Sequence, residues 1–144
     1  MTVAAILKHK GHDVAAVRPT ETVAEVAKLL SSRRIGAVLV RDAADQLLGI
    51  VSERDIVRAL ANNGATTLSM TAGQLMTRAL TTATPATTVN QAMTLMTAGR
   101  FRHMPVLDGG RVVGIISIGD VVKSRILQQE QEVDSLKAYV TGAA

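Results

Sequence analysis

Two stretches of the chain share one pattern. Residues 49–58 read GIVSERDIVR, and residues 114–123 read GIISIGDVVK. Each has a glycine, two β-branched residues and a serine, followed three positions later by an aspartate. Short β-branched runs are typical of strands, and Ser-x-x-Asp before an apolar run is typical of a helix N-terminus. Both stretches therefore predict the end of a strand and the start of a helix.

A second pair of segments shows that the whole chain is an internal repeat. Residues 18–23, RPTETV, recur as residues 84–89, TPATTV, at a spacing of 66 (84 minus 18), whereas the first pair is spaced by 65 (114 minus 49). The lost residue falls in a turn, where length changes are tolerated. Residues 2–7 also resemble residues 71–76, so a leading short helix is predicted to repeat as well.

Each copy is predicted to be a β-α-β-β-α unit. In the first copy we expect a strand near 14–17, a helix over 22–31, a hairpin of strands 37–40 and 47–51, and a helix from 52. In the second copy we expect a strand over 80–83, a helix over 88–98, strands 104–107 and 111–116, and a helix from 117. Thr22 with Glu25, and Thr88 with Gln91, predict capping boxes.

The fold class is therefore α/β in the broad sense, an α+β body of small sheets flanked by helices. The expected domains are repeat 1 over residues 1–66, repeat 2 over 67–127, and a C-terminal helical extension over 128–144. One copy alone would leave an apolar side exposed, so the copies are expected to pair around a pseudo-two-fold axis. A ligand would then sit in the cleft that they share.

Composition narrows the classes of function. The chain has 144 residues, of which 47% are hydrophobic, and no cysteine, so a compact core is expected and disulfides and Cys-based metal sites are excluded. The net charge of +4 and a pI near 10.0 favour an anionic partner. Phe101 and Tyr139 are the only aromatic residues, which disfavours a nucleic acid, because single-strand binding uses stacking platforms. We expect a cytoplasmic protein with no membrane anchor.

The paired Gly-x-x-Ser-x-x-Asp segments within a repeated β-α-β-β-α unit resemble a tandem CBS domain pair, or Bateman module, from about residue 2 to residue 127. The resemblance implies binding of an adenosine-containing ligand: AMP, ADP, ATP, NAD(H) or S-adenosylmethionine. It also implies a homodimer and an effector protein that the sequence does not identify. No catalytic residue, no catalytic cofactor and no metal site is predicted.

The resemblance assigns Asp55 and Asp120 to the ribose hydroxyls. Carboxylates accept from two vicinal hydroxyls, and Ser52 and Ser117, at helix N-termini, are suited to phosphate. Residues entering the middle strands are expected to frame the adenine, and the copies differ there in where they place positive charge. The predicted site comprises Ile35, Gly36, Ala37, Ser52, Arg54 and Asp55 in the first copy, and Thr82, Phe101, Arg102, His103, Met104, Pro105, Ser117, Gly119 and Asp120 in the second.

Simpler interpretations stand beside these. Each aspartate could serve only to cap its helix. The basic cluster Lys8, His9, Lys10 and His12 fits a solvated helix end, although a phosphate tail could reach it. Met93, Met96 and Met104 have core-facing spacing and are expected to pack rather than to bind a cofactor. The apolar stripe Ile126, Val133, Leu136 and Val140 fits docking on the same module or on a second chain.

The preferred function is a regulatory module in which an adenine nucleotide shifts the populations of two states and so changes affinity for a partner. A ligand-free interaction scaffold, a nucleic-acid-binding module and a nucleotide-hydrolysing enzyme are the alternatives. The enzyme is disfavoured because the chain has three histidines and no clustered spacing typical of metal ligands.

Overall fold

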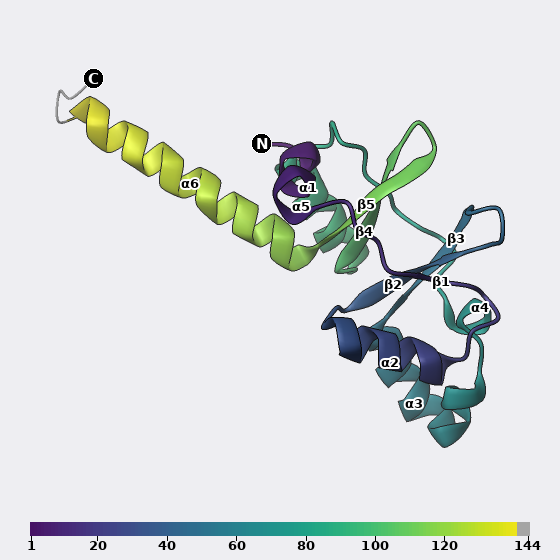
Figure 1. The fold of residues 1–144 in the computed structure, drawn as a ribbon. Helices are drawn as coiled ribbons and strands as arrows, with labels where there is room; N and C mark the ends of the chain where they lie inside the picture. Colours follow the sequence, from purple (N-terminus) through teal and green to yellow (C-terminus); the bar gives the residue numbers. More distant parts are fainter. Residues whose placement is uncertain (141–144) are drawn as a thin grey trace. The chain divides into compact units, whose positions relative to one another are not determined.

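The computed structural model describes residues 1–140, which form two compact units (Figure 1). The central unit is Asp13–Thr81. The terminal unit joins Met1–His12 to the described chain from Thr82 onward. The predicted class is confirmed: both units combine helices with a small sheet.

The central unit contains a three-stranded sheet of order β1-β2-β3, with β1 parallel to β2 and β2 antiparallel to β3. Its elements are β1 (Ala16–Val17), α2 (Val23–Arg33), β2 (Ala37–Arg41), β3 (Leu47–Ser52), α3 (Glu53–Asn63), the 3-10 helix η1 (Gly64–Ser69) and α4 (Ala72–Leu75). Buried Val26 of α2, Val38 of β2 and Ile56 of α3 belong to one core, so both helices cover the sheet.

The terminal unit is built on a two-stranded antiparallel sheet. Its elements are α1 (Val3–Lys10), α5 (Val89–Gly99), β4 (His103–Asp108), β5 (Arg111–Ser117) and α6 (Ile118–Val140). Met96 and Met104 are fully buried in its core and Met93 packs against it, which confirms that these methionines are packing residues. The predicted extension from residue 128 continues α6 up to Val140, and residues 141–144 lie outside the described chain.

The strand predicted over 80–83 is wrong, because only Ala83 pairs, through a single parallel bridge to Val106. Proline supplies the reason. In the central unit the N–H of Leu39 donates to the Ala15 carbonyl and extends the pairing of β1. Pro105 occupies the matching position of β4 and has no N–H to donate, so the ladder cannot extend before Ala83.

Helix starts follow the predicted caps with one exception. The box of Thr88 with Gln91 is complete, and Thr71 forms another with Gln74. The box of Thr22 with Glu25 is half-formed: the Thr22 hydroxyl accepts from the Glu25 N–H at 3.2 Å, but no return bond from the Glu25 side chain is described. Glu21 instead accepts a bond from the Arg18 N–H at 2.6 Å and stabilises the preceding turn.

The repeats exchange their leading helices. Helix α1 begins repeat 1 but packs in the terminal unit through Val3, Ile6 and Leu7, whereas α4 begins repeat 2 but packs in the central unit. The backbone bonds are equivalent: Val3 N–H donates to the Thr87 carbonyl, and Ala72 N–H donates to the Glu21 carbonyl, each at 2.8 Å. The compact units therefore do not coincide with the sequence repeats drawn at residues 66 and 67.

Glycine at the start of each repeated stretch makes this exchange sterically feasible. A Cβ added to Gly49 would lie 2.7 Å from the Met76 sulfur and 2.7 Å from the Thr77 carbonyl oxygen. A Cβ added to Gly114 would lie 2.6 Å from Leu7 Cδ2. The leading helix of the other repeat thus lies directly on each glycine.

Candidate functional site

In the central unit, the predicted Ser52–Asp55 turn is a complete capping box at the start of α3. Asp55 Oδ2 accepts from the Ser52 N–H and the Ser52 hydroxyl, both at 2.9 Å, and the Asp55 N–H donates to Ser52 Oγ at 3.2 Å. Arg58 Nη1 lies 3.9 Å from Asp55 Oδ1. The capping role of this aspartate is confirmed.

The equivalent turn in the terminal unit has a different partner. Asp120 Oδ2 accepts from the Ser117 N–H at 2.8 Å, and the Asp120 N–H donates to Ser117 Oγ at 3.1 Å. Lys10 Nζ, at the end of α1, donates to the same Asp120 oxygen at 2.6 Å and to the Ile115 carbonyl at 3.0 Å. A lysine distant in the sequence therefore reaches the carboxylate that begins α6.

This contact changes the acidity of Asp120. Partial burial raises the pKa of Asp120, but hydrogen bonds from Lys10 and Ser117, together with the charge of Lys10, outweigh burial. The net result is a pKa below the ordinary value of 3.8. Asp120 is consequently an anion at neutral pH, with an oxygen pair suited to accepting hydrogen bonds.

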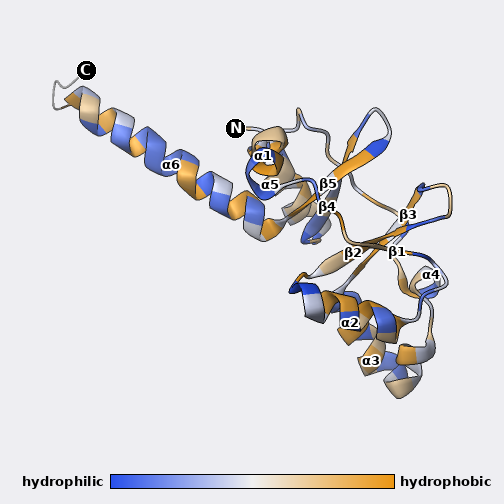
Figure 2. Cartoon of the chain, in the orientation of Figure 1, coloured by the Kyte–Doolittle hydropathy of each residue, from blue (hydrophilic) through white to orange (hydrophobic). Residues whose placement is uncertain are grey.

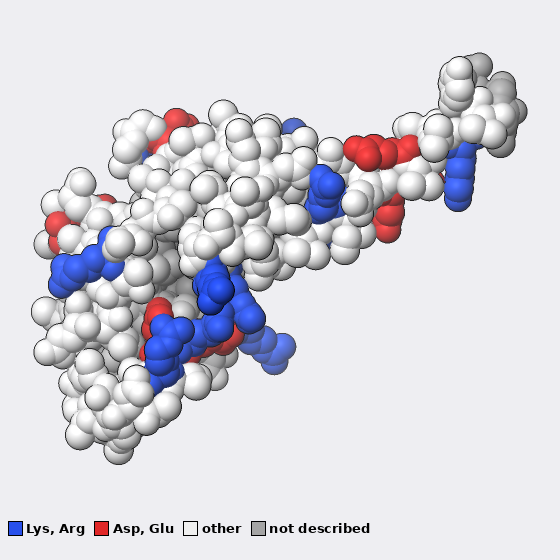
Figure 3. Space-filling view, turned by 180° about the vertical axis from the view of Figure 1, so that it is seen from behind, with Lys and Arg blue, Asp and Glu red and all other residues white. Residues whose placement is uncertain are grey.

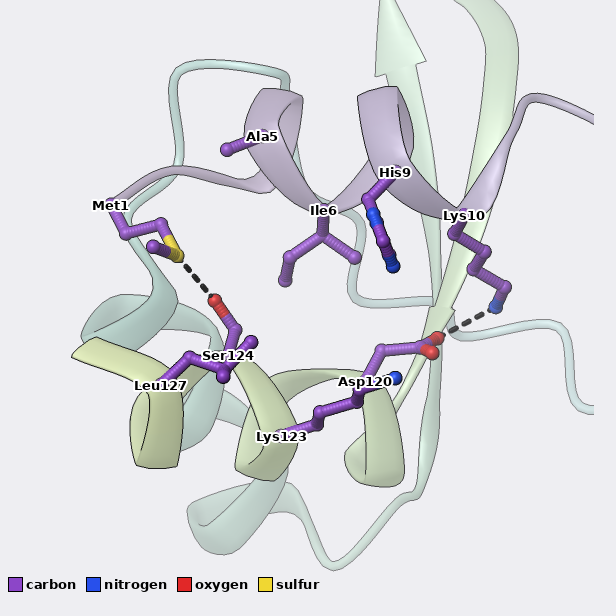
Figure 4. Close-up of a pocket in the computed structure, with 9 residues that line it drawn as sticks. All are labelled: Met1, Ala5, Ile6, His9, Lys10, Asp120, Lys123, Ser124 and Leu127. Carbon is purple, nitrogen blue, oxygen red and sulfur yellow. Dashed lines mark hydrogen bonds and ion pairs between the residues drawn. The ribbon is translucent and has the colours of Figure 1, made fainter. Parts of the chain in front are cut away.

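A pocket of about 490 Å³ adjoins Asp120 (Figure 4). It lies between α1 and the first turns of α6, with the Lys10–Asp120 pair at one end and Met1, which accepts a hydrogen bond from Ser124, at the other. The remaining lining residues are Ala5, Ile6, His9, Lys123 and Leu127. The floor is mainly apolar, while His9, Lys10 and Lys123 supply cationic or titratable nitrogen atoms.

The residues predicted to enter the middle strands occupy equivalent places. The Gly36 carbonyl accepts from the N–H of Glu53, and the Arg102 carbonyl accepts from the N–H of Ile118, each at 2.8 Å. In both units, therefore, the strand entry is bonded to the first residue of the capped helix. Within each unit, the structure brings these two parts of the predicted site together.

Other predicted site residues can contribute only in part. The side chains of Ala37, Met104 and Pro105 are buried in the cores, so these residues can offer a ligand their backbone alone. Ile35 and Phe101 are partly buried against the same cores, and His103 is half-buried at the start of β4.

Four further residues of the predicted site are exposed: Arg54, Arg102, Gly119 and Thr82. A Cβ added to Gly119 would meet only Ser117 Oγ at 3.6 Å, so packing does not require glycine there.

Asp120 is the one residue of the predicted site that lines the described pocket. Sequence reasoning identified His9 and Lys10 as part of a basic cluster but did not connect them to Asp120. It missed Met1, Ser124 and Leu127. The match of residues 2–7 to residues 71–76 indicated that the leading helix repeats, but a sequence match does not indicate which unit that helix packs against. The other histidine of the cluster, His12, lies with Nδ1 2.8 Å from the Val113 carbonyl.

Within residues 1–140, no helix is both long and apolar enough to cross a membrane. Among the same residues, no three His, Asp or Glu side chains gather as a metal-ligand set.

Comparison with known proteins identifies relatives. The CBS domain model matches residues 4–62 and 72–126. The CBS domain-containing protein CBSX3, mitochondrial, of Arabidopsis thaliana is 34% identical over 149 residues, covering 98% of this chain and 72% of that protein. The crystal structure of the CBS-domain containing protein ATU1752 from Agrobacterium tumefaciens is 46% identical with a TM-score of 0.84, covering 86% of this chain and 92% of that one.

A further solved structure contains ligands. It is the CBS domain pair of protein MJ0100 in complex with 5'-methylthioadenosine and S-adenosyl-L-methionine. It is 28% identical with a TM-score of 0.77, covering 90% of this chain and 98% of that one. With both repeats matched by the family model and relatives similar along nearly the whole chain, the protein belongs to the CBS domain family, as a CBS pair.

Proposed function

We propose that this CBS pair is a regulatory module that binds an adenosine-containing ligand through Asp120 and Asp55. Binding shifts the populations of two arrangements of the module and thereby changes its affinity for an effector protein. Such coupling requires that the ligand bind the two arrangements with different affinity. AMP, ADP, ATP and NAD(H) are the expected ligands, and the inter-repeat cleft is their expected location.

The observation that carries the proposal is the chemistry around Asp120. Its ionised carboxylate lies beside an apolar pocket of about 490 Å³, within the range of small-molecule sites. Lys10, His9 and Lys123 line the same pocket. A ribose with vicinal hydroxyls and an attached phosphate matches this combination, because the carboxylate accepts from the hydroxyls while the basic side chains attract the phosphate.

Capping and ribose binding are compatible in this geometry. The Ser117 N–H and Lys10 both donate to Oδ2 of Asp120, and each carboxylate oxygen has two lone pairs. A phosphate near Lys10 would compete with Asp120 for the ammonium group and release part of the carboxylate for the ribose. Asp55 has an equivalent cap, with Arg58 rather than a lysine as its cationic neighbour, so the same ribose chemistry is proposed at both aspartates.

The ligand complex of the MJ0100 CBS pair supports the adenosine class. It is 28% identical to this chain and covers 90% of it, and both of its bound molecules are adenosine derivatives. Neither carries a phosphate group, so the basic residues near Asp120 are the feature of this chain that favours a nucleotide.

The test is isothermal titration of the full chain with AMP, ADP, ATP, NAD, NADH and S-adenosylmethionine, with GMP as the control ligand. Asp120→Asn and Asp55→Asn keep an oxygen for the helix cap while removing the charge. Each lost charged hydrogen bond contributes about 1.5–3 kcal/mol, so affinity at that site should fall about tenfold or more. The matched control is Asp108→Asn, at an exposed aspartate that ends β4.

The proposal is supported if adenosine ligands bind the parent and the Asp108→Asn variant equally but bind the double variant, Asp55→Asn with Asp120→Asn, weakly. Equal binding to the parent and the double variant would refute the ribose role. A parent that binds none of the ligands would favour the interaction scaffold. Conversion of ATP or AMP during the titration would favour the enzyme, so the expectation of no catalysis stays a prediction, as does a cytoplasmic location.

A further inference from the structure

The side chains in the last part of α6 are open to solvent. Residues 129–140 are all exposed, and in Figure 1 this half of the helix runs away from the rest of the terminal unit. The apolar side chains remain in water: Ile126 is 49% exposed, Val133 50% and Leu136 63%. In the described structure, therefore, this stripe does not dock on its own module. Because an isolated helix of this length is marginal in water, another surface is needed to stabilise it.

Five exposed apolar residues of α6 follow a heptad pattern, whereas Leu127 and Tyr139 fall outside it. Positions 122, 126, 129, 133, 136 and 140 alternate in steps of four and three residues, and all except Gln129 are apolar. Hydropathy alternates along the whole helix in Figure 2. In heptad notation, Ile126, Val133 and Val140 fall at a positions, whereas Val122, Gln129 and Leu136 fall at d positions. All three a positions are β-branched and one d position, Leu136, is leucine; β-branched residues at a with leucine at d favour two parallel strands.

Charges that flank this seam distinguish the possible orientations. Arg125 and Glu132 fall at g positions, and Glu130 and Lys137 fall at e positions. In a parallel, in-register pair each g residue meets the e residue five positions later on the partner, so that Arg125 meets the partner's Glu130 and Glu132 meets the partner's Lys137. Both contacts join opposite charges, and symmetry makes each of them twice.

An antiparallel pair that overlaps along all of residues 122–140 would join like charges. With a positions facing d positions, Glu130 meets the partner's Glu130, Glu132 meets the partner's Glu132, and Lys123 meets the partner's Lys137. Figure 3 shows acidic and basic side chains along this projecting helix. Arg125 also donates through Nη1 to Asn90 of α5, but its guanidinium has five N–H donors and can serve both partners.

We propose that residues 122–140 form a parallel, in-register, two-stranded coiled coil with a second copy of this chain. Gln129 pairs with the partner's Gln129 inside the seam, where a polar residue at one core position specifies the register. The proposal gives a defined interface to the homodimer that the sequence suggested. It does not depend on nucleotide binding, so it can fail while the proposed function holds, and the reverse.

The absence of cysteine from the chain allows a direct test. In a parallel, in-register coil, identical seam residues face each other within the Cα separation of about 7 Å that a disulfide can span. Full-length Leu136→Cys should therefore form a covalent dimer in an oxidised glutathione buffer. The matched control is Gln131→Cys, at an f position on the opposite face of the helix. We expect the seam cysteine to cross-link about tenfold faster or more, because it reacts within the dimer.

Two further experiments test the orientation and the pairing of charges. An antiparallel coil would instead cross-link a mixture of Ile126→Cys and Leu136→Cys chains, because residue 126 then faces residue 136. Glu132→Lys should weaken the dimer in sedimentation experiments by placing two lysines together, and Glu132→Lys with Lys137→Glu should restore it. Equal cross-linking of Leu136→Cys and Gln131→Cys, cross-linking only in the mixture, or a monomeric parent would each overturn the proposal.

Discussion

The two Ser-x-x-Asp turns have the same sequence pattern and the same cap, but different electrostatic surroundings. Asp55 is bonded within its own turn by the N–H and hydroxyl of Ser52. Asp120 accepts from the N–H of Ser117 in its own turn and, in addition, from Lys10 at the end of α1. The matching residue after α4 is Ala79, and α4 ends at Leu75, whereas α1 runs to Lys10. The leading helix therefore supplies a cation to Asp120, whereas the ion-pair partner of Asp55 is Arg58, on the helix that the motif itself begins.

The same helices also differ in how tightly they pack on the repeated glycines. At Gly49 a Cβ would meet the backbone oxygen of Thr77 as well as the Met76 side chain. At Gly114 its three nearest atoms would all belong to the Leu7 side chain. A side chain can change rotamer while a backbone carbonyl moves only with its chain, so the central unit should be less tolerant of substitution.

The largest effect should come from removing the helix anchors. Leu7 is 1% exposed and Met76 is 8% exposed, and each lies in the core of its unit. Leu7→Ala and Met76→Ala should each lower the free energy of unfolding by about 2–5 kcal/mol, because buried methylene groups are lost and a cavity remains. Urea denaturation followed by circular dichroism measures both. A loss below about 0.5 kcal/mol, the size of an ordinary surface substitution, would contradict the exchanged packing.

Overpacking of the glycines should have the next largest effect. Gly49→Ala should lower the free energy of unfolding by about 1–3 kcal/mol, and Gly114→Ala should cost less. The comparison is sharpened by adding Leu7→Ala, which removes the side chain that the new methyl group would meet. In that background Gly114→Ala should be nearly neutral in the same denaturation experiment. Equal costs at both glycines would show that the difference between the units has no energetic consequence.

The smallest effect concerns the Lys10–Asp120 pair. A lowered carboxylate pKa stabilises the folded state above the ordinary Asp value of 3.8, and this stabilisation is lost as pH falls through the lowered pKa. Because both side chains are partly exposed, Lys10→Met should cost under about 1 kcal/mol at neutral pH. The cost should shrink in acid, where Asp120 is protonated in both proteins.

Urea denaturation of the parent and Lys10→Met at several pH values measures this change. Lys8→Met provides the control, because it removes an exposed lysine from the same helix. A cost of Lys10→Met that stays constant from neutral pH to below 3.8 would mean that the bond from Lys10 to the Ile115 carbonyl, rather than the ion pair, is responsible.

Much of the fold was predictable because local chemistry encodes it. The hairpins and the helices from residues 23, 53, 89 and 118 follow apolar periodicity and caps that lie within a few residues of each other. The absence of a strand at 80–83 was not predictable in this way, since pairing before Ala83 would need an N–H that Pro105 lacks, 22 positions after Ala83 (105 minus 83). The capping role of both aspartates was an expected alternative, but the Lys10 contact was not.

The sequence by itself determined that the chain is a repeat of two capped β-α-β-β-α units, and the family follows from that repeat. It also determined the heptad pattern of α6, because both features are periodic in the chain. Only the tertiary structure decided which unit each leading helix joins and that Lys10 reaches Asp120. The reason is physical: contacts between residues 110 positions apart depend on how buried surfaces fit together, and neither composition nor spacing specifies that fit.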